Sequence, residues 1–299
     1  MEKFKAGFVA IIGLPNAGKS TLLNLLIETK LAPVSSKPQM TRKSVIGILN
    51  GENYQCVFVD SPGIIDPAYL LQEYMMKDIR RNIADADILI VVVDISNIYR
   101  NRNLLLEKIN PIVNNFKNKV IFVLNKTDVV KQDKIIENLK WVSDNFKFDE
   151  IFPLSCRREQ NVKELKDIIV KFLPENEPYY DEDLVGIQNV RFFVKEYILE
   201  SIYQYLQKEL PYSCLIGIEE YKEHENRKDY IRALIYVERE SHKHIIIGKK
   251  GEMLKKIGKS SREKIENMIG KGVYLELYVK VLENWKDRKD IIKNVYKEE

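Results

Sequence analysis

GFVAIIGLPNAGKSTLLNLLIET, residues 7–29, is the stretch that decides the fold of this chain. The apolar run Gly7–Ile12 leads into Gly13-Leu14-Pro15-Asn16-Ala17-Gly18-Lys19-Ser20, and a helical pattern begins at Thr21. Strand, GxxxxGK[ST] and helix stand in the order that a phosphate-binding loop requires. We therefore expect backbone N–H groups to face phosphates, Lys19 to reach the β and γ phosphates, and the Ser20 hydroxyl to bind Mg²⁺.

Short apolar runs alternate with helical patterns from this stretch to about residue 173. The later runs are YQCVFVD, DILIVVVD, NKVIFVLN and EIFPLS. Such alternation predicts an α/β domain, a mainly parallel sheet with helices on both faces. Residues 174–186, PENEPYYDEDLVG, contain two prolines and several acids and predict a linker. We therefore expect a first domain over residues 1–173 and a second over 187–299.

Composition limits the class of protein. The chain has 299 residues, 45% of them hydrophobic and 31% charged, which excludes large-scale disorder. The apolar N-terminal run is too short to span a bilayer, and it lacks a cleavage site for a secretory signal. Three widely spaced cysteines offer neither a zinc site nor a disulfide framework, so a reducing cytoplasm is expected.

Positive charge is concentrated near the C-terminus. Residues 241–299 contain 15 Lys or Arg and 9 Asp or Glu, whereas the rest of the chain contains 33 and 35. This asymmetry favours a polyanionic partner, although a solvated lysine-rich surface explains it equally well when taken alone.

A second motif of the first domain is Asp60-Ser61-Pro62-Gly63, which follows the apolar run Val57–Val59. A DxxG sequence by itself is a common turn, but its place after a phosphate loop favours a nucleotide site. We expect Asp60 to hold the magnesium through water. The N–H of Gly63 is expected to meet the γ-phosphate.

Asn125-Lys126-Thr127-Asp128 follows the apolar run VIFVL and distinguishes guanine from adenine. A carboxylate at Asp128 can accept hydrogen bonds from N1–H and the 2-amino group of guanine, and adenine has neither donor. The alternative is that Asp128 only caps a helix. Ser155 and Cys156 follow the last apolar run and resemble the loop that presents a backbone N–H to the guanine oxygen.

In this order the motifs resemble the TrmE-Era-EngA branch of the P-loop GTPases, a likeness carried by GLPNAGKS and by Pro38-Gln39-Met40-Thr41-Arg42. The resemblance implies that GTP and GDP bind here and that GTP orders residues around 30–45 and 61–75. It also implies that Thr41 meets magnesium and the γ-phosphate. Asn16 matches an asparagine that helps related enzymes to hold K⁺, which would supply positive charge near the phosphates.

Ile64 stands after the DSPG sequence, where Ras-like enzymes usually place a glutamine that orients the attacking water. An isoleucine cannot hydrogen-bond a nucleophile. This branch of the family is known for such a replacement, so the resemblance implies slow intrinsic hydrolysis that depends on other groups or on a partner.

The second domain is expected to be α+β. Apolar residues recur at steps of three and four from Val190 to Leu206, which predicts one long helix. Two strands follow, YSCLIGIEEY and YIRALIYVE, then two helices around a glycine loop, the strand YLELYVKV and a charged helix from Asn284. With GxxG in the loop, this order resembles a type II KH domain.

The glycine loop contains Ile247-Gly248-Lys249-Lys250-Gly251. The glycines would let the backbone approach a single RNA strand, the lysines would lie near its phosphates, and residues Ile245–Ile247 would line the groove for the bases. A bare GxxG is also a common helix end. Only the surrounding order of elements favours the KH interpretation.

A GTPase domain followed by such a KH domain resembles the Era family over nearly the whole chain. The resemblance implies a Mg²⁺-dependent GTPase that binds the 3′ end of small-subunit ribosomal RNA and acts in 30S subunit assembly. It further implies a cytoplasmic monomer with peripheral association at the inner face of the cell membrane and no DNA partner. Two alternatives stay open: an RNA-binding module with a structural nucleotide site, and a related GTPase for tRNA modification or large-subunit assembly.

Overall fold

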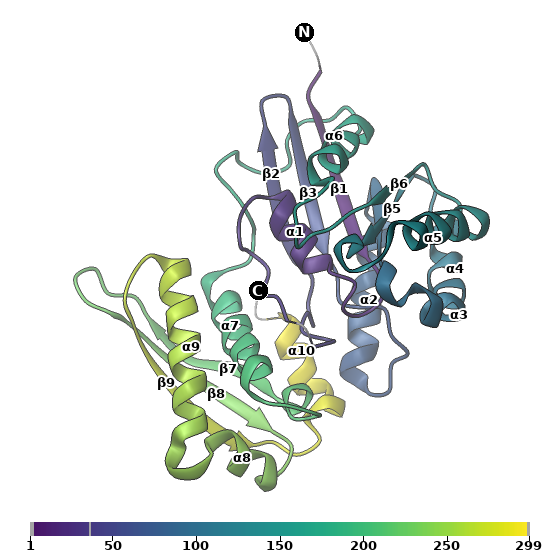
Figure 1. Ribbon diagram of the computed structural model, residues 1–299. Coiled ribbons are helices and arrows are strands. Elements are labelled where there is room, and N and C mark those ends of the chain that lie inside the picture. Colours follow the sequence, from purple (N-terminus) through teal and green to yellow (C-terminus); the bar gives the residue numbers. More distant parts are fainter. Residues whose placement is uncertain (1–2, 36, 298–299) are drawn as a thin grey trace. The chain divides into compact units, whose positions relative to one another are not determined.

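The structure, a computed structural model, describes residues 3–35 and 37–297. The chain divides into two compact units, both drawn in Figure 1. The first comprises Met1–Ala32, Thr41–Ala68 and Gln72–Ile187. The second comprises Pro33–Met40, Tyr69–Leu71 and Gln188–Glu299. Short pieces of the N-terminal half therefore pack with the C-terminal unit.

The first unit is built on a six-stranded sheet with the order β2-β3-β1-β4-β5-β6. All neighbouring strands are parallel except β2 and β3. The predicted α/β fold is thus confirmed, with one antiparallel strand at the edge. The strands are β1 (Lys5–Ile12), β2 (Val45–Gly51), β3 (Tyr54–Asp60), β4 (Ile88–Asp94), β5 (Lys119–Asn125) and β6 (Glu150–Pro153).

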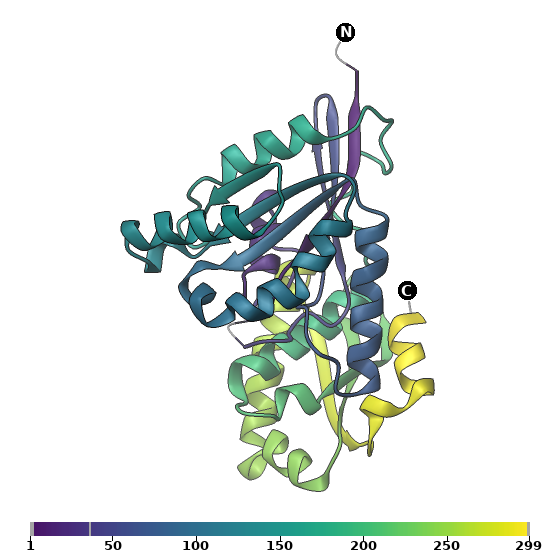
Figure 2. The ribbon, with the colours of Figure 1, turned by 90° about the vertical axis from the view of Figure 1, so that its right-hand side faces the viewer.

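Helices lie on both sides of this sheet, as Figures 1 and 2 show. Because both faces are covered, the central strands are apolar almost throughout, and Ile88–Val92 of β4 is completely buried. The helices are α1 (Lys19–Leu26), α2 (Leu70–Ala84), α3 (Ile98–Lys108), α4 (Asn110–Asn115), α5 (Gln132–Asn145) and α6 (Val162–Phe172).

The second unit contains a three-stranded sheet, β7-β8-β9, with β7 antiparallel and β9 parallel to the central β8. Helices α7, α8 and α9 pack on one face of it. Alternation along β8 explains this, since Ile231, Ala233 and Ile235 are fully buried, whereas Tyr230 and Arg232, which point to the other face, are partly exposed. The elements are α7 (Val190–Tyr205), β7 (Leu215–Lys222), β8 (Asp229–Val237), α8 (Glu240–Ile247), α9 (Glu252–Ile269), β9 (Val273–Val281) and α10 (Lys289–Lys297).

The expectation that the last helix begins at Asn284 is wrong. Asn284 has φ +50°, and Trp285 lies in a short 3₁₀ turn with its side chain fully buried. The indole N–H of Trp285 donates to the carbonyl of Ser213 at 3.1 Å, so the chain is anchored before α10 starts at Lys289. Burying an unpaired indole N–H would be costly. The chain therefore keeps this hydrogen bond instead of starting the helix at Asn284.

One piece of the second unit comes from the stretch that precedes Thr41. The Lys37 ammonium donates to the carbonyls of Tyr203 and Leu206 at the C-terminal end of α7. The Tyr203 hydroxyl donates to the carbonyl of Gln39 at 2.9 Å. A cation at this end of a helix meets unsatisfied carbonyls and the negative end of the helix dipole.

No helix in the described part of the chain is long and apolar enough to cross a membrane.

Candidate functional site

The nucleotide motifs meet at the carboxyl edge of the first sheet. Strand β1 ends at Ile12, just before the phosphate loop, while β3, β4 and β5 end in Asp60, Asp94 and Asn125. Parallel strands present their carboxyl ends at one edge, so segments far apart in sequence become neighbours there. The structure brings together every predicted motif of the first domain.

The phosphate loop, residues 13–20, turns directly into α1, whose first residue is Lys19. Gly18 has φ +100°, and a Cβ there would lie 2.2 Å from Asn125 Nδ2. Only glycine fits this conformation and this contact. The N–H groups at the start of α1 are consequently free to face an anion.

Two opposite charges are buried together behind the loop. Lys19 is 6% exposed and Asp60 is fully buried. The Lys19 ammonium donates to the carbonyls of Gly13 at 3.3 Å and Leu14 at 3.1 Å. Burial lowers the pKa of Lys19 to about 8, against the attraction of Asp60. Burial raises the pKa of Asp60 to about 6, against the effects of Lys19 and the Ser20 hydroxyl. Phosphates and a cation would stabilise both charged forms.

Three hard oxygen donors converge beside this pair. The Ser20 hydroxyl donates to Asp60 Oδ2 at 2.5 Å and lies 3.1 Å from the Thr41 hydroxyl. Asp60 Oδ1 is buried and has no hydrogen-bond partner among the described residues. Such an orphaned carboxylate oxygen, next to two hydroxyls, fits Mg²⁺, which prefers oxygen ligands and keeps waters and phosphate oxygens in its shell.

The DSPG segment lies against the phosphate loop. A Cβ on Gly63 would stand 2.8 Å from the Pro15 Cα and N atoms, so the two backbones touch. The N–H of Ile64 donates to the carbonyl of Gly13 at 3.0 Å, and the Ile64 side chain is buried. Ile64 therefore supplies packing at the position after DSPG and no polar group.

The carboxylate of Asp128, the predicted guanine contact, is held by a hydroxyl. Ser155 Oγ donates to Asp128 Oδ1 at 2.7 Å, and the N–H of Arg158 donates to Ser155 Oγ at 3.1 Å. The N–H of Thr127 donates to the carbonyl of Leu154 at 3.2 Å. These contacts fix the orientation of the Asp128 carboxylate before any ligand arrives, which reduces the cost of recognition.

Asn125 ties three loops together. Its amide Nδ2 donates to the carbonyl of Ala17 at 2.9 Å, and its Oδ1 accepts from the N–H groups of Lys126 at 2.8 Å and Cys156 at 3.0 Å. The phosphate loop, the NKTD segment and the segment after β6 are thereby fixed relative to one another. Burial raises the pKa of the Cys156 thiol to about 12, which keeps the thiol protonated.

Sequence reasoning missed Asp94. The Lys126 ammonium donates to Asp94 Oδ2 at 2.7 Å and to the carbonyl of Asn16 at 2.8 Å. Asp94 therefore anchors the lysine of the NKTD motif against the phosphate loop. The available signal was the acid that ends DILIVVVD, because β4 and β5 pair so that Asp94 stands beside Asn125.

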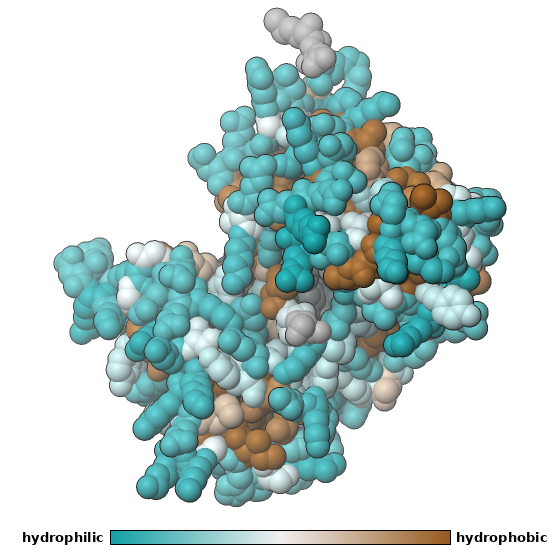
Figure 3. Space-filling view, in the orientation of Figure 1, coloured by the Kyte–Doolittle hydropathy of each residue, from teal (hydrophilic) through white to brown (hydrophobic). Residues whose placement is uncertain are grey.

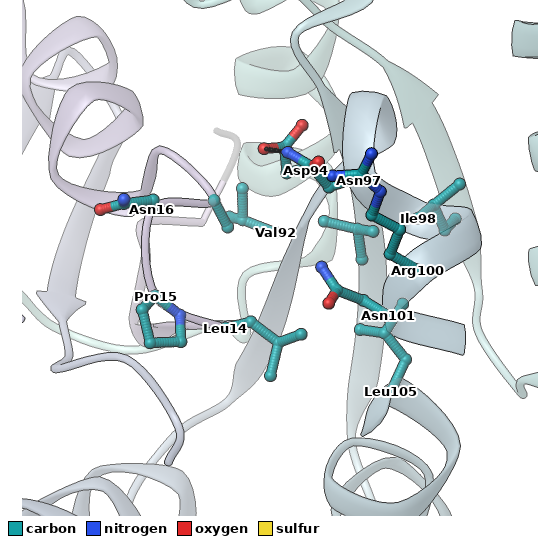
Figure 4. Close-up of a pocket in the computed structure, with 12 residues that line it drawn as sticks. Leu14, Pro15, Asn16, Val92, Asp94, Asn97, Ile98, Arg100, Asn101 and Leu105 are labelled. Atoms are coloured by element: carbon teal, nitrogen blue, oxygen red, sulfur yellow. Dashed lines mark hydrogen bonds between the residues drawn. The ribbon is translucent and has the colours of Figure 1, made fainter. Parts of the chain in front are cut away.

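A cavity of about 260 Å³ opens next to the phosphate loop. Figure 4 shows Leu14, Pro15 and Asn16 on one side and Arg100 and Asn101 of α3 on the other. Asn16 therefore lines a cavity of the first unit, beside the predicted phosphate-binding loop.

The glycine loop of the second unit connects α8 to α9. Gly248 has φ +72°, and a Cβ there would meet the Met253 Cβ at 2.8 Å. Gly251, with φ +79°, has open space around the same position. Lys249 and Lys250 are exposed between the two glycines. The predicted loop therefore exists, with glycine required at its first position and cations at its tip.

An open groove of about 440 Å³ runs beside this loop between α9 and β9. Apolar lining comes from Leu254, Leu275 and Leu277. The basic residues Lys255, Lys259 and Arg262 recur along one side of α9 at helical spacing. An apolar floor with a basic rim suits the bases and the phosphates of one nucleic-acid strand.

The residues expected to line this groove are not the ones that do. Ile246 is fully buried, Ile245 is 51% exposed, and Ile247 is not among the residues that line the groove. Successive residues of a helix point about 100° apart, so three isoleucines in a row cannot share one wall. Sequence signals for the true lining were the basic spacing on α9 and the alternation of YLELYVKV.

On the face seen in Figure 3, hydrophilic side chains dominate and hydrophobic ones gather in small patches.

Comparison with known protein families agrees with this two-part description. Residues 8–126 match the family of the 50S ribosome-binding GTPase, and residues 202–286 match the KH domain. GTPase Era of Clostridium botulinum is 40% identical to this chain, over 98% of either protein. GTPase Era of Caldanaerobacter subterraneus is 39% identical and covers 98% of this chain and 97% of the relative.

Two solved structures are similar over nearly the whole length. A variant of Aquifex aeolicus Era bound to GDP·AlF4⁻ is 34% identical, with a TM-score of 0.90 over 97% of this chain and 98% of that one. Era in complex with MgGDPNP and nucleotides 1506–1542 of 16S ribosomal RNA is 35% identical, with the same TM-score and the same coverage.

Proposed function

The chain belongs to the Era family of GTPases, and on that premise we propose that it is a GTP-driven switch that binds the 3′ end of small-subunit ribosomal RNA and acts in 30S assembly. The observation that carries the proposal is the presence, in one chain, of an Asp128 carboxylate that is oriented by Ser155 at the predicted guanine site and of the basic groove beside the glycine loop. A relative that matches 97% of this chain was solved with both MgGDPNP and nucleotides 1506–1542 of 16S ribosomal RNA.

The nucleotide site works by replacing buried protein contacts with phosphate contacts. We assign the GTP site to residues 13–21, 60–64, 125–128 and 155–156. Lys19, which now donates to two loop carbonyls, would turn to the β and γ phosphates. Ser20 and Thr41 would contact Mg²⁺ directly and Asp60 would hold it through water, and the cation would neutralise charge on the phosphates.

Hydrolysis in this protein must do without a glutamine next to DSPG. The buried Ile64 leaves water positioning to backbone groups, among them the N–H of Gly63, and charge stabilisation to cations. Asn16 would help to hold a K⁺ ion there. Turnover in K⁺ and Na⁺ buffers, with and without Asn16→Ala, tests this assignment. Faster turnover in K⁺ that the variant loses is expected, and equal rates in all four conditions would contradict it.

RNA would lie in the groove between α9 and β9. Gly248 and Gly251 would let the backbone of the loop approach the RNA backbone, and Lys249 and Lys250 would meet its phosphates. Ile247, at the end of α8, would contact the strand at the loop. A GxxG loop clamps about four nucleotides, so a longer RNA needs further surface.

The decisive experiment measures the affinity of purified protein for a 3′-terminal 16S RNA oligonucleotide in the GTP-analogue, GDP and nucleotide-free states. We expect at least a tenfold difference between states, because a switch must change its affinity for its target. Equal affinity in all states would favour the other candidate, an RNA-binding module with a structural nucleotide site, which the apolar Ile64 motivates. Roles in tRNA modification or large-subunit assembly would show as crosslinks to those RNAs in cells.

The proposed location is the cytoplasm, with peripheral association at the inner face of the cell membrane, and the proposed state is a monomer without a DNA partner. Support comes from the family resemblance, and from Cys56, Cys156 and Cys214, which are free and buried thiols. Fractionation of cell extracts at low and high salt tests the membrane part. Recovery of the protein only in the ribosomal fraction at both salt concentrations would contradict the membrane association.

A further inference from the structure

The sheet of the second unit has one face on which α7, α8 and α9 do not pack. Helices α7, α8 and α9 pack on the face that carries Ile231, Ala233 and Ile235. The opposite face carries Tyr230 and Arg232 from β8, paired in register with Tyr274 and Glu276 from β9. Farther along β9, Tyr278 pairs with Leu234. Tyr274 is 57% exposed and Tyr278 is 48% exposed in the whole chain.

Planar groups form a continuous row on this face. The rings of Tyr230 and Tyr274 stack with their centroids 6.0 Å apart and an interplanar angle of 14°. The Arg232 guanidinium lies 5.7 Å from the Tyr230 ring centroid and 6.0 Å from that of Tyr278. The row therefore runs Tyr274, Tyr230, Arg232, Tyr278, and all four groups are of the kinds on which nucleobases stack.

One carboxylate holds this row in place. Glu276 Oε2 accepts from the Tyr230 hydroxyl at 2.8 Å, from Arg232 Nε at 3.3 Å and from the Tyr278 hydroxyl at 3.4 Å. The hydrogen bond from Tyr230 is the main cause that lowers the pKa of Glu276, so the carboxylate stays ionised. Rings that are already oriented lose little conformational entropy when a ligand stacks on them.

Strand β9 connects this face to the groove. It stands at the end of the three-stranded sheet, next to β8, and is therefore an edge strand. Leu275 and Leu277 of β9 line the groove, while their neighbours Tyr274 and Tyr278 point to the other side. A strand of RNA that leaves the groove across β9 reaches the tyrosine row within one strand thickness.

Charge on this face is balanced by ion pairs. Lys280 contacts Glu219 at 3.7 Å, and Arg232 contacts Glu276 at 3.3 Å and Glu219 at 4.0 Å. A balanced surface does not attract phosphates over a distance, so contact here has to come from the bases. Bases offer flat, uncharged faces, which match tyrosine rings better than a charged protein surface would.

We propose that the tyrosine row Tyr274, Tyr230, Arg232 and Tyr278 is a second RNA contact, on which bases next to the groove-bound segment stack. This proposal rests on the RNA-binding function proposed above. The RNA segment on the tyrosine row would be single-stranded and continuous with the segment in the groove. Each base that stacks on an aromatic ring adds to the affinity, so these rings contribute measurably to the binding of long RNA only.

The test compares a six-nucleotide and a twenty-nucleotide RNA from the 3′ end of 16S RNA. For the double variant Tyr274→Ala/Tyr278→Ala we expect about tenfold or greater loss of affinity for the long RNA and no change for the short one. The double variant to phenylalanine, which keeps both rings, should bind long RNA as the wild type does. Tyr99→Ala removes a tyrosine that is 77% exposed in the first unit and serves as the control.

Several outcomes would overturn the proposal. Unchanged affinity of the double alanine variant for the long RNA is one, and equal loss for both lengths is another, since that would place the effect in the groove. Loss of a ribosomal-protein crosslink with normal RNA affinity would assign the face to a protein instead. Failure of the wild type to bind either RNA would refute the proposed function itself and is thus distinguishable. Unfolding temperature and GTP affinity verify that the variants are folded.

Discussion

Two glycine loops in this protein each precede a helix and carry lysine, but they treat their charges in opposite ways. In the phosphate loop, Lys19 is 6% exposed and lies beside the fully buried Asp60. In the GxxG loop, Lys249 and Lys250 are exposed to solvent. Buried charges are costly until a ligand of complementary charge and shape pairs with them. Exposed ones cost little and attract any polyanion within a Debye length.

This difference teaches how each loop selects its ligand. The buried loop rejects a ligand that leaves its charges unpaired, such as a nucleoside without phosphates, while the choice of base is assigned to Asp128 outside the loop. The exposed loop can only add affinity in small, salt-dependent increments, so selection among RNAs has to come from the groove beside it. Four predictions test the contrast, in order of decreasing effect.

The largest effect is expected for Asp128→Asn. An amide donates where the carboxylate only accepts, so it faces the donors N1–H and 2-amino of guanine with a donor of its own. Affinity for GTP should fall about a thousandfold, and affinity for xanthosine triphosphate, which has a carbonyl at that position, should rise. Fluorescent nucleotide titration measures both.

The matched control is Asp133→Asn, the same change at an exposed acid in the first turn of α5. It should leave both affinities unchanged. If Asp128→Asn also kept the wild-type preference for GTP, the carboxylate would be a helix cap and no base contact.

In the GxxG loop, Gly248→Asp should weaken RNA binding by about thirtyfold. The aspartate introduces strain of about 2 kcal/mol at φ +72°, and its charge repels phosphate. Gly270→Asp is the matched control, because Gly270 also has φ +72° but lies at the end of α9 with open space around it. Fluorescence anisotropy with the short RNA measures both variants. Similar losses in the two would show that strain in the fold, rather than the loop, governs RNA binding.

The buried pair predicts how nucleotide affinity depends on pH. Phosphates raise the pKa of Lys19 from about 8, so binding requires proton uptake above pH 8 and affinity falls as pH rises. Magnesium lowers the pKa of Asp60 from about 6, so binding releases a proton below pH 6 and affinity falls as pH drops. On the acid side and on the alkaline side of the profile, the change in nucleotide affinity should approach about tenfold per pH unit.

Calorimetric titration with Mg·GDP between pH 5 and pH 9 measures this profile. Comparison with Asp60→Asn isolates the acid side, because the nucleotide's own protonation is the same for both proteins. A change on the acid side that persists in the variant would show that Asp60 does not titrate in this range.

The smallest effect is expected for Lys249→Ala/Lys250→Ala. Two exposed cations should contribute about fivefold in RNA affinity, and their loss should reduce the salt dependence by about 1.4 in the slope of log affinity against log salt. Lys147→Ala, an exposed lysine in the first unit, should change neither value. An unchanged slope would mean that these lysines do not meet phosphates.

Much of the fold and of the nucleotide site could be predicted from the sequence, because the signals are local. A phosphate loop needs glycines and a lysine within eight residues, and a buried parallel strand is a short apolar run. The parallel strands of the first sheet, the second-unit order and the meeting of the motifs at one edge follow from these patterns, whereas the antiparallel edge strand β2 was not predicted. The last helix was misplaced because Trp285, which anchors the chain before α10, has its partner at Ser213, far away in sequence.

Sequence alone predicted that motifs for guanine nucleotide, for magnesium and for a glycine-loop module stand in one chain, since each is a short motif whose chemistry does not depend on distant residues. Only the tertiary structure decided that Asp94 anchors Lys126, that Leu275 and Leu277 line the groove, and that Tyr274 and Tyr278 form a row on the other face. Strand register brings residues together that are tens of positions apart, and alternation across the pleat sends neighbours to opposite faces. Neither property can be read from a local pattern.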